Sequence, residues 1–439
     1  MPVIRVSGTL DLLGLHAAHR QRYPFLLQTA AGDGWDILLA FPGEFHLLPA
    51  SSAQTTLFLN RLDECRHSLG DGLQGEGEAQ PLPFRGGWFV YLGYELLHQF
   101  EPSVPLRPGL PDFPIGCLAR IPAAILVDNR SRHTYFFAEA GHEKCLAAMQ
   151  RDAGRAIRFK PRPIVLASLE EENETLFLEG VERVKAYIRE GDAFQVNLSR
   201  RWQSRLASRN SAADIYGALR HHNPAPFAGV ADFGRHRIVS SSPERLLRVR
   251  DGLIETRPIA GTHPRSAVAA EDDKLRRALL AHPKERAEHI MLVDLERNDL
   301  GRICRPGSVT VDELMKVRSY AHVHHIESNV QGRLRAGITP GEVVRALFPG
   351  GTITGCPKVR TMQIIGELEP APRLAYTGSM GYLNRDGDMD LNILIRTFML
   401  DDDELSFNAG AGIVADSVPE KELQETRAKA KGLLKALGA

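Results

Sequence analysis

The sequence predicts an α+β fold. Strands of alternating or continuously apolar character are interleaved with helical segments, but they follow no regular strand–helix–strand rhythm. That irregular order disfavours a doubly wound parallel sheet, in which strands and helices alternate. With 43% hydrophobic and 25% charged residues among 439, the chain has a globular composition and is long enough to bury a large core.

The first 168 residues are predicted to form an N-terminal subdomain of short strands and turns. Three apolar runs predict strands, at 35–41, Gly87–Leu92 and Ala123–Asp128, with glycines and prolines between them. A shift toward proline at 159–163 and toward charge at 168–174 is typical of a connector. We therefore predict a domain boundary there and a second domain over residues 169–439.

Four helices are predicted in the second domain. Apolar residues recur at helical spacing over 177–188, and Gly191 then ends the first helix. The second runs over Pro283–Gly301, and the third follows Pro357. The last is expected to begin at 417–420, a capping-box pattern with a proline in the first turn.

Charge and cysteine content argue against several classes of function. The 54 Lys and Arg residues balance 54 Asp and Glu residues, so no basic excess favours nucleic acid. The five cysteines never form a Cys-x-x-Cys pair, which disfavours a disulfide framework or a zinc site. We find no targeting segment and no apolar run of roughly 18 residues. We expect a reduced, cytoplasmic protein without a membrane partner.

Two of the predicted helices carry closely spaced carboxylates. Glu422, Glu425 and Lys429 share one face of the last helix, and Glu285 and Glu288 lie about one turn apart on the second. Two carboxylate pairs could meet around a hard cation, since Mg²⁺ prefers oxygen ligands and keeps several waters. The alternative is two solvated helix faces, which the spacing alone favours.

Arg396 lies in the apolar run 391–400, which predicts a buried strand. A buried guanidinium without an anion is costly, so we expect a carboxylate opposite it. That carboxylate belongs either to an internal Asp or Glu or to a bound ligand. Nearby, Gly410 and Gly412 either let backbone N–H groups approach a ligand oxygen or form a simple tight turn.

Three further segments present polar groups at turns or strands. Glu244 follows an apolar strand in Ser240-Ser-Ser-Pro-Glu244, and His325 lies in an alternating strand over 323–330. The segment 349–358 is a Gly/Thr-rich turn that opens a helix, but Cys356 stands where a Walker loop needs its lysine. Taken singly, each segment fits an ordinary turn or a hydrogen-bonded histidine.

Taken together, these segments resemble the chorismate-utilising enzymes, the family of anthranilate synthase component I and aminodeoxychorismate synthase component I. The resemblance spans most of the chain. It implies two packed antiparallel sheets flanked by helices, with residues 169–439 as the chorismate-binding catalytic domain. Its motifs are long and ordered, and they include Arg257-Pro-Ile-Ala-Gly-Thr262, Lys284-Glu-Arg-Ala-Glu-His289, Asp294-Leu-Glu-Arg-Asn-Asp-Leu-Gly301, Gly350-Gly-Thr-Ile-Thr-Gly-Cys-Pro-Lys358 and Pro419-Glu-Lys-Glu-Leu-Gln-Glu425.

The resemblance implies a magnesium site. Glu288 and Glu425 would bind Mg²⁺, with Glu285 and Glu422 beside them holding metal-bound water. The ion would in turn bind the ring carboxylate of chorismate, and Lys429 would add positive charge to the same pocket.

The resemblance also implies how the rest of the substrate is held and activated. Arg396 and Tyr376, with the backbone near Gly410 and Gly412, would bind the enolpyruvyl carboxylate. Glu244 matches the general acid that protonates the departing hydroxyl at ring carbon 4, a task that requires a raised pKa. The remaining matches are the base position His325 and the ring-site positions Ala260, Gly261, Thr262 and Thr352.

The family resemblance does not by itself specify the product, because chorismate can give anthranilate or 4-amino-4-deoxychorismate. Four segments are more similar to aminodeoxychorismate synthases: Gln195-Val-Asn-Leu-Ser199, Asn223-Pro-Ala-Pro-Phe227, residues 240–244 and Gly378-Ser-Met-Gly-Tyr382. Ala260 argues against this, because most of those enzymes have a lysine there that attacks carbon 2.

The preferred prediction is aminodeoxychorismate synthase component I, for p-aminobenzoate and folate synthesis, with free ammonia in place of the lysine. Anthranilate synthase component I and an inactive chorismate-binding regulatory protein are the alternatives. None of the five cysteines lies in a Gly-x-Cys-x-Gly-x-Gln turn, so we expect a separate glutamine amidotransferase subunit to supply ammonia in a heterodimer.

Overall fold

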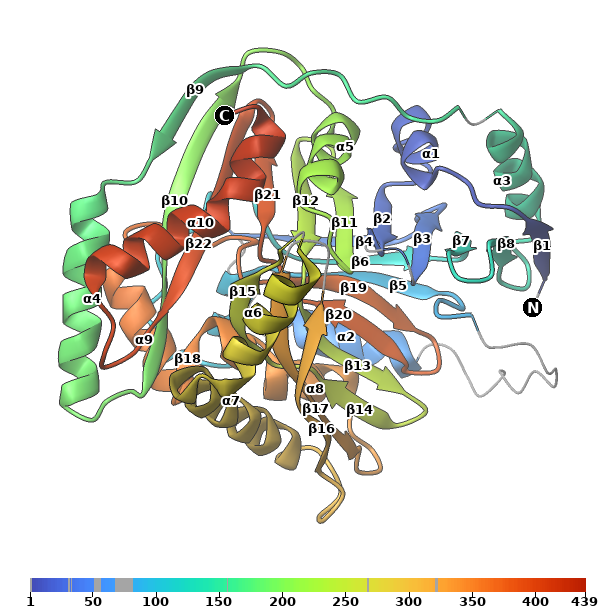
Figure 1. The fold of residues 1–439 in the computed structure, drawn as a ribbon. Helices are drawn as coiled ribbons and strands as arrows, with labels where there is room; N and C mark the ends of the chain where they lie inside the picture. The colour runs from blue at the N-terminus through green and yellow to red at the C-terminus, as the bar shows by residue number, and fades with distance from the viewer. Residues whose placement is uncertain are drawn as a thin grey trace.

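Two antiparallel sheets packed face to face form the centre of the protein (Figure 1). The computed structural model describes residues 2–30, 32, 34–50, 57–67, 82–155, 157–266, 268–319 and 323–439. Within these ranges one sheet has 12 strands and the other has 10. All pairings between their strands are antiparallel. The predicted α+β fold is confirmed.

The 12-stranded sheet combines strands from both ends of the chain. Its order is β1 (Val3–Ser7), β8 (His133–Ala138), β7 (Ala123–Asp128), β3 (Trp35–Ala40), β2 (Phe25–Gln28), β11 (Phe227–Asp232), β12 (His236–Ser242), β21 (Thr397–Asp401), β22 (Glu404–Ile413), β10 (Gln195–Leu206) and β18 (Gly355–Cys356), with β9 (Leu166–Glu171) also on β10. The long β10–β22 pair carries several residues of the site described below.

The 10-stranded sheet is built in the same way. Its order is β15 (Ile259–Pro264), β17 (Val323–Arg333), β14 (Leu253–Thr256), β13 (Arg245–Arg250), β20 (Met389–Asn392), β19 (Ser379–Asn384), β5 (Gly87–Leu92), β6 (Pro114–Ile121) and β4 (Phe45–Pro49), with β16 (Thr310–Ser319) also on β17. Strands from both sides of residue 168 share both sheets, and the predicted division into residues 1–168 and 169–439 stays a prediction.

Helices cover the outer face of each sheet (Figure 1). On the 12-stranded sheet these are α1 (Leu12–Ala18), α3 (Lys144–Gly154), α5 (Ala212–His222) and α10 (Pro419–Leu437), with α4 (Glu174–Arg189) and α9 (Lys358–Leu368) beside β10. On the 10-stranded sheet they are α2 (Leu57–His67), α7 (Pro283–Gly301) and α8 (Pro340–Leu347), while α6 (Ala269–Ala281) contacts β15. No helix of the described ranges is long and apolar enough to span a membrane.

One predicted strand is wrong in an informative way. Residues 391–400 do not form a single strand, because β20 ends at Asn392 in one sheet and β21 begins at Thr397 in the other. The chain between them crosses from sheet to sheet, and Ile393 and Leu394 are buried on the way. The run is apolar because it passes through the interior. Arg396 sits at the end of the crossing with φ of 53°.

Two smaller predictions also need correction. The charged part of the predicted connector, 168–174, contributes to the strand β9, whose exposed residues suit its place against one side of β10. The last helix begins at Pro419, but its N-cap is Val418 and no side chain caps it. Ser417 Oγ instead accepts a hydrogen bond from the Val414 amide at 3.0 Å. The predicted helices over 177–188 and Pro283–Gly301 and after Pro357 are confirmed.

Candidate active site

A cavity of about 240 Å³ lies between strands of both sheets, a short 3₁₀ turn, η2 (Gly351–Ile353), and α10. Seven of the predicted site residues line it. They are Glu244 after β12, His325 in β17, Thr352 in η2, Tyr376 before β19, Arg396 before β21, Gly410 in β22 and Lys429 in α10. The fold therefore gathers residues from the whole second half of the chain at one place.

Glu244 is the buried acid of this cavity, with 6% of its surface exposed. Burial raises its pKa to about 8, and the negative charges of Glu296 and Glu327 add to the effect. Thr352 Oγ1 donates a hydrogen bond to Glu244 Oε1 at 2.7 Å and, with Lys429, partly opposes the increase. The carboxyl group therefore carries a proton near neutral pH, as a general acid must.

His325 faces the same cavity as a neutral imidazole. Burial lowers its pKa to about 4. Its Nδ1 lies 3.1 Å from the carbonyl oxygen of Gly261, which can only accept, so Nδ1 carries the hydrogen. The lone pair of the neutral ring is then on Nε2, which is the form a base requires.

The other ring-site positions of β15 lie beside the cavity. Ala260 is not among the described lining residues, although its neighbour Ile259 is. Gly261 joins this strand to the site through its hydrogen bond from His325. The backbone of Thr262 pairs with that of His325, but the Thr262 side chain lies outside the described part of the structure.

Gly410 lets two polar side chains come close to the backbone of β22. A Cβ at this position would lie 2.8 Å from Tyr376 Oη and 2.5 Å from Asn197 Oδ1, so only glycine fits. The carbonyl oxygen of Gly410 accepts a hydrogen bond from Lys429 Nζ at 2.9 Å. Gly412 lies two residues further along the strand and outside the described lining.

The sequence left open whether the carboxylate opposite Arg396 belongs to the protein or to a ligand. Within the described residues its guanidinium forms no ion pair, so the expected internal carboxylate is absent there. Burial lowers the pKa of the guanidinium, which still remains charged at neutral pH. Tyr376 lines the cavity beside it, and burial raises the pKa of that phenol to about 12, so it remains a hydrogen-bond donor. Together they offer a binding place for an anion.

The four glutamates that the resemblance assigns to Mg²⁺ lie on α7 and α10, outside the described lining. Glu425 is exposed and pairs with the cavity residue Lys429 at 2.7 Å, and Glu422 is buried in the preceding turn. A Cβ on Gly261 would lie 2.8 Å from Glu285 Oε2, which places that carboxylate next to β15. Glu288 follows on the same helix and is partly buried.

The carboxylates of α7 and α10 fit Mg²⁺ if they supply only part of its coordination shell. No three His, Cys, Asp or Glu side chains of the described ranges form a ready-made metal cluster. A magnesium ion commonly takes one or two protein carboxylates and completes its shell with water and substrate oxygens, so it needs no such cluster. Carboxylates on α7 and α10 can supply this smaller set.

Comparison with known proteins decides the family. The sequence pattern of the chorismate binding enzymes matches residues 24–435, nearly the whole chain. The chain belongs to the chorismate binding enzyme family. Its structure is similar to the crystal structure of anthranilate synthase component I from Streptococcus pneumoniae TIGR4, with a TM-score of 0.80, 32% sequence identity, and coverage of 91% of this chain and 92% of that one.

Relatives of both product types resemble this chorismate binding enzyme about equally. Anthranilate synthase component 1 of Aquifex aeolicus is 50% identical over 261 residues, which are 60% of this chain and 52% of that protein. Aminodeoxychorismate synthase component 1 of Bacillus subtilis is 48% identical over 261 residues, 60% of this chain and 55% of that protein. Sequence similarity thus establishes the family, and the product has to be argued from the site.

The sequence analysis gave no site role to several residues of this family member's site. Asn197 and Asn408 line the cavity, and Glu296 and Glu327 raise the pKa of Glu244. A signal for Glu327 was present, because it follows His325 by two residues in a strand and so faces the same side of the sheet. Asn197 and Asn408 lie on β10 and β22, whose pairing the sequence pattern does not reveal, and the predicted helix that carries Glu296 did not show that this residue faces Glu244.

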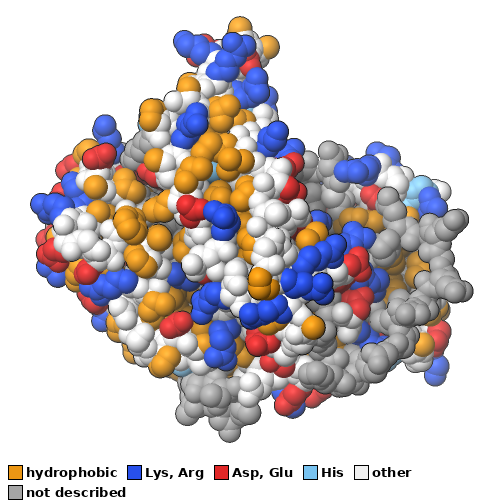
Figure 2. Space-filling model, turned by 90° about the horizontal axis from the view of Figure 1, so that it is seen from below, with side chains coloured by type: hydrophobic (Ala, Val, Ile, Leu, Met, Phe, Trp, Pro, Cys, Tyr) orange, Lys and Arg blue, Asp and Glu red, His pale blue; other side chains and the backbone are white. Residues whose placement is uncertain are grey.

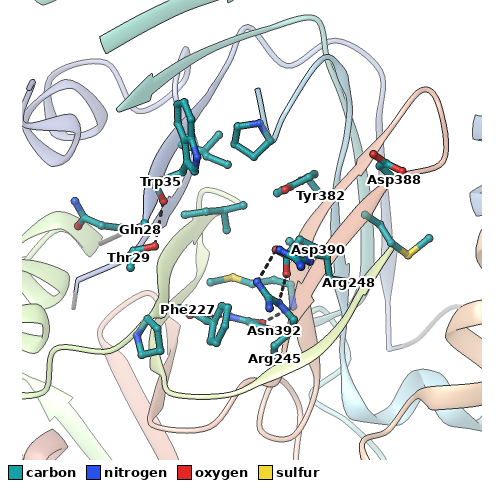
Figure 3. Close-up of a pocket in the computed structure, with 18 of the residues that line it drawn as sticks. Gln28, Thr29, Trp35, Phe227, Arg245, Arg248, Tyr382, Asp388, Asp390 and Asn392 are labelled. Atoms are coloured by element: carbon teal, nitrogen blue, oxygen red, sulfur yellow. Dashed lines mark hydrogen bonds and ion pairs between the residues drawn. The ribbon is translucent and has the colours of Figure 1, made fainter. Parts of the chain in front are cut away.

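A second cavity of about 300 Å³ lies between the two sheets of this chorismate binding enzyme (Figure 3). Two of its arginines form ion pairs with carboxylates of the protein. Arg245 pairs with Asp390 at 2.9 Å and with Glu255 at 3.3 Å, and Arg248 pairs with Glu255 at 2.9 Å. The two cavities are neighbours, because Glu244 lines the first and the next residue, Arg245, lines the second.

Proposed function

We propose that the protein is aminodeoxychorismate synthase component I, which converts chorismate and ammonia to 4-amino-4-deoxychorismate. The observation that carries the proposal is the place of Asn197, which belongs to the segment 195–199 that resembles aminodeoxychorismate synthases. Asn197 lines the cavity, and its Nδ2 donates to the carbonyl oxygen of Thr352 at 3.4 Å. Thr352 in turn donates to Glu244. The segment that resembles this product class thus touches the partner of the proposed general acid.

Chorismate has two carboxylates, and the cavity offers separate groups for them. Arg396 lacks an ion pair in the described structure, so the enolpyruvyl carboxylate would supply its counter-charge, with Tyr376 donating a second hydrogen bond. Lys429 would attract the ring carboxylate from the α10 side, since its Nζ already lies at the cavity wall.

The ring carboxylate would also meet Mg²⁺. Glu288 and Glu425 would hold the ion, and Glu285 and Glu422 would hold its water. When bound, the ion supplies a positive charge that a carboxylate can coordinate. We expect removal of Mg²⁺ by a chelator to abolish turnover, and Glu425→Gln to raise the concentration of Mg²⁺ required.

Glu244 would act first in the reaction. Its carboxyl proton passes to the hydroxyl at ring carbon 4, which leaves as water. Ammonia adds at carbon 2 as the ring double bonds shift, and the resulting ammonium group returns a proton to Glu244. A second ammonia then adds at carbon 4, and the first leaves carbon 2 as ammonia with a proton from Glu244. The new ammonium group at carbon 4 finally gives its proton back to the carboxylate. The net change is chorismate plus ammonia to 4-amino-4-deoxychorismate plus water.

Ala260 explains why ammonia is proposed as the first nucleophile. A methyl side chain provides no amine, and the position pairs with Ile326 in the β15–β17 ladder, one residue from the cavity-lining Ile259. We expect Ala260→Lys to form a covalent adduct with chorismate, detectable by mass spectrometry, if its amine reaches carbon 2.

A separate glutamine amidotransferase would supply the ammonia, and the surface offers a face for it. Exposed apolar side chains, among them Phe194 at 67%, Ile290 at 43% and Val359 at 38%, surround a groove of about 750 Å³. Figure 2 shows hydrophobic side chains among charged ones on the underside of the molecule. Exposed apolar groups around a groove are typical of protein interfaces.

Anthranilate synthase component I remains the second candidate, because Ala260 and the Aquifex aeolicus relative favour it. An inactive chorismate-binding protein is disfavoured by the buried, hydrogen-bonded Glu244. Incubation with chorismate, Mg²⁺ and ammonium salt, followed by chromatographic separation of the products, decides among the three. We expect 4-amino-4-deoxychorismate. Fluorescent anthranilate would establish the second candidate, and no turnover even with an amidotransferase would establish the third.

A further inference from the structure

Arg373 is buried behind the active cavity and does not line it, with only 1% of its surface exposed. All five of its N–H donors have acceptors. Nε and Nη2 bind the two carboxylate oxygens of Glu369 at 2.8 and 2.6 Å. Nη1 donates to the carbonyl oxygen of Ile353 at 3.2 Å and to Thr377 Oγ1 at 3.3 Å. Nη2 also donates to the carbonyl oxygen of Asn197 at 2.7 Å.

Three walls of the cavity are held by this guanidinium. Asn197 in β10, Ile353 in η2 and Tyr376 before β19 all line the cavity. Arg373 binds the first two through their carbonyl oxygens. Its guanidinium carbon lies 5.4 Å from the ring centre of Tyr376, within the range of a cation–π contact.

The η2 turn is the wall that matters for proton transfer. Ile353 follows Thr352, whose hydroxyl donates to Glu244 Oε1 at 2.7 Å. The other end of the turn is held by Glu296, which accepts the backbone N–H of Gly351. Thr352 is therefore presented from a turn that is fixed at both ends, at one end by Arg373.

We propose that Arg373 is a positioning residue for the general acid, and this rests on the proposed function. It fixes the η2 turn so that the Thr352 hydroxyl donates to Oε1 of Glu244. With Oε1 accepting that hydrogen bond, the transferable proton is on Oε2, from where it passes to the leaving hydroxyl. A lysine cannot replace Arg373, because an ammonium group has three donors in place of five and no plane to stack on Tyr376.

The experiment compares Arg373→Lys with Arg200→Lys. Both arginines are buried and lie next to an aromatic ring and a carboxylate, since Arg200 is 0% exposed, pairs with Glu171 at 2.5 Å and lies over Trp202. The guanidinium of Arg200 donates to Glu171 and to the carbonyl oxygen of Glu172, neither of which lines the cavity; only the backbone of Arg200 pairs with that of the lining residue Ala409. Each lysine keeps the positive charge, and thermal unfolding reports any loss of stability that the two variants share.

The first measurement is the pH dependence of kcat/KM, followed as chorismate consumption with ammonium. We expect Arg373→Lys to lower kcat by about 100-fold, as misplacement of a catalytic contact does. Its alkaline limb should move to higher pH, because the Thr352 hydrogen bond lowers the pKa of Glu244. Thr352→Val, which removes the hydroxyl, should move the alkaline limb by the same amount. Thr352→Ser, which keeps a hydroxyl, should return the limb to its wild-type position. The double variant Arg373→Lys/Thr352→Val should have the same alkaline limb as Thr352→Val alone.

Other charged groups around Glu244 are the same in all these variants. Glu296 faces it from α7, Glu327 from β17 and Lys429 from α10, while His325 and Arg396 line the same cavity. A shift that occurs in Arg373→Lys and not in Arg200→Lys therefore reports the η2 turn. An unmoved limb in Arg373→Lys, or shifts that add in the double variant, would overturn the proposal.

A second measurement does not depend on turnover. The infrared C=O band of protonated Glu244, identified by its loss in Glu244→Gln, can be titrated in each protein. Its midpoint should rise in Arg373→Lys and stay unchanged in Arg200→Lys. If the wild-type protein consumes no chorismate, the proposed function fails, and this titration still decides whether Arg373 positions the η2 turn. An unchanged midpoint in Arg373→Lys would reject the positioning role.

Discussion

At the scale of single residues, the site depends on two ionisable groups that burial removes from water. Glu244 keeps its proton because it is buried beside Glu296 and Glu327. Arg396 keeps its charge without an ion pair in the described structure. Each arrangement is unfavourable for the folded protein alone and favourable for a reaction that needs an acid and an anion-binding group. Both effects can be measured separately from catalysis.

Glu244 should make stability depend on pH. Its pKa rises from an ordinary 4.5 to about 8 on folding, so between these values the folded protein binds more protons than the unfolded one. Its contribution is therefore complete below about pH 4.5 and is lost as the pH rises through 8. We expect Glu244→Gln to flatten this decline by up to about 1.4 kcal/mol per pH unit. Urea unfolding at several pH values tests this, and an unchanged slope would contradict it.

Glu244→Gln should also lose activity while it keeps the fold. An amide cannot donate the proton that the leaving hydroxyl needs, so kcat should fall by about 10²- to 10⁴-fold. Chorismate affinity, measured by calorimetry, should change little.

Arg396→Met should separate binding from stability. Loss of the guanidinium should raise the KM for chorismate by about 10- to 100-fold, as loss of a charge-assisted hydrogen bond does. The melting temperature should hold or rise, because no ion pair of the described structure is broken. Arg245→Met is the matched control: it strips a partner from Asp390 and Glu255 and should cost about 3–5 kcal/mol. A large loss of stability in Arg396→Met would show that its charge is paired within the protein.

At the scale of elements, short irregular segments place the chemistry that the strands support. Glu244 lies between β12 and β13, Thr352 in η2, and Arg396 after the crossing from β20. Gly261 interrupts the regular pairing of β15 with β17 and has φ of 62°. Its missing side chain makes room for Glu285 of α7 and Leu279 of α6. The bulge therefore sets how closely these helices approach the site.

Gly261→Ala should show this close approach. Its Cβ would lie 2.8 Å from both Glu285 Oε2 and Leu279 Cδ1, so one of them must move. Gly252→Ala is the control, because Gly252 has φ of 71° and no atom within 4 Å of the added Cβ. Both variants carry the left-handed backbone strain, but Gly261→Ala should be less stable by a further ~1–3 kcal/mol from overpacking. Equal unfolding free energies would contradict the tight contact.

At the scale of the whole molecule, the active cavity lies between the two sheets, and the groove of the proposed docking face lies among α7, α8, β18 and the start of α9. The groove beside Phe194 is walled by Cys356, Pro357 and Lys358, which follow the η2 turn of the active cavity. A partner bound at this groove would therefore sit close to the site that uses its ammonia.

Phe194→Asp should uncouple the partner from the chemistry. We expect glutamine-dependent turnover with an amidotransferase to fall at least ~10-fold, as for an apolar interface anchor, while ammonium-dependent turnover persists. Val165→Asp, at an exposed apolar residue that does not line the groove, should change neither rate. Equal loss of both activities in Phe194→Asp would argue against a docking role.

The sequence predicted much of this arrangement, and the exceptions have physical causes. Apolar periodicity and helix-end residues placed α4, α7 and α9, and family motifs named the seven residues that line the cavity. The crossing before Arg396 could not be seen, because burial gives the same apolar pattern in a strand and in a segment that passes between sheets. The role proposed for Arg373 was also hidden, since it depends on carbonyl groups of β10 and η2 that lie far apart in the sequence.

The crossing segment has one more consequence. It is one of several connections between the two sheets, and Arg396 is the last residue on it. If one sheet moves relative to the other, Arg396, which would bind the substrate, must be displaced. Chorismate should accordingly protect the whole sandwich against unfolding, with backbone amides of β20 and β21 exchanging together and more slowly when the ligand is present.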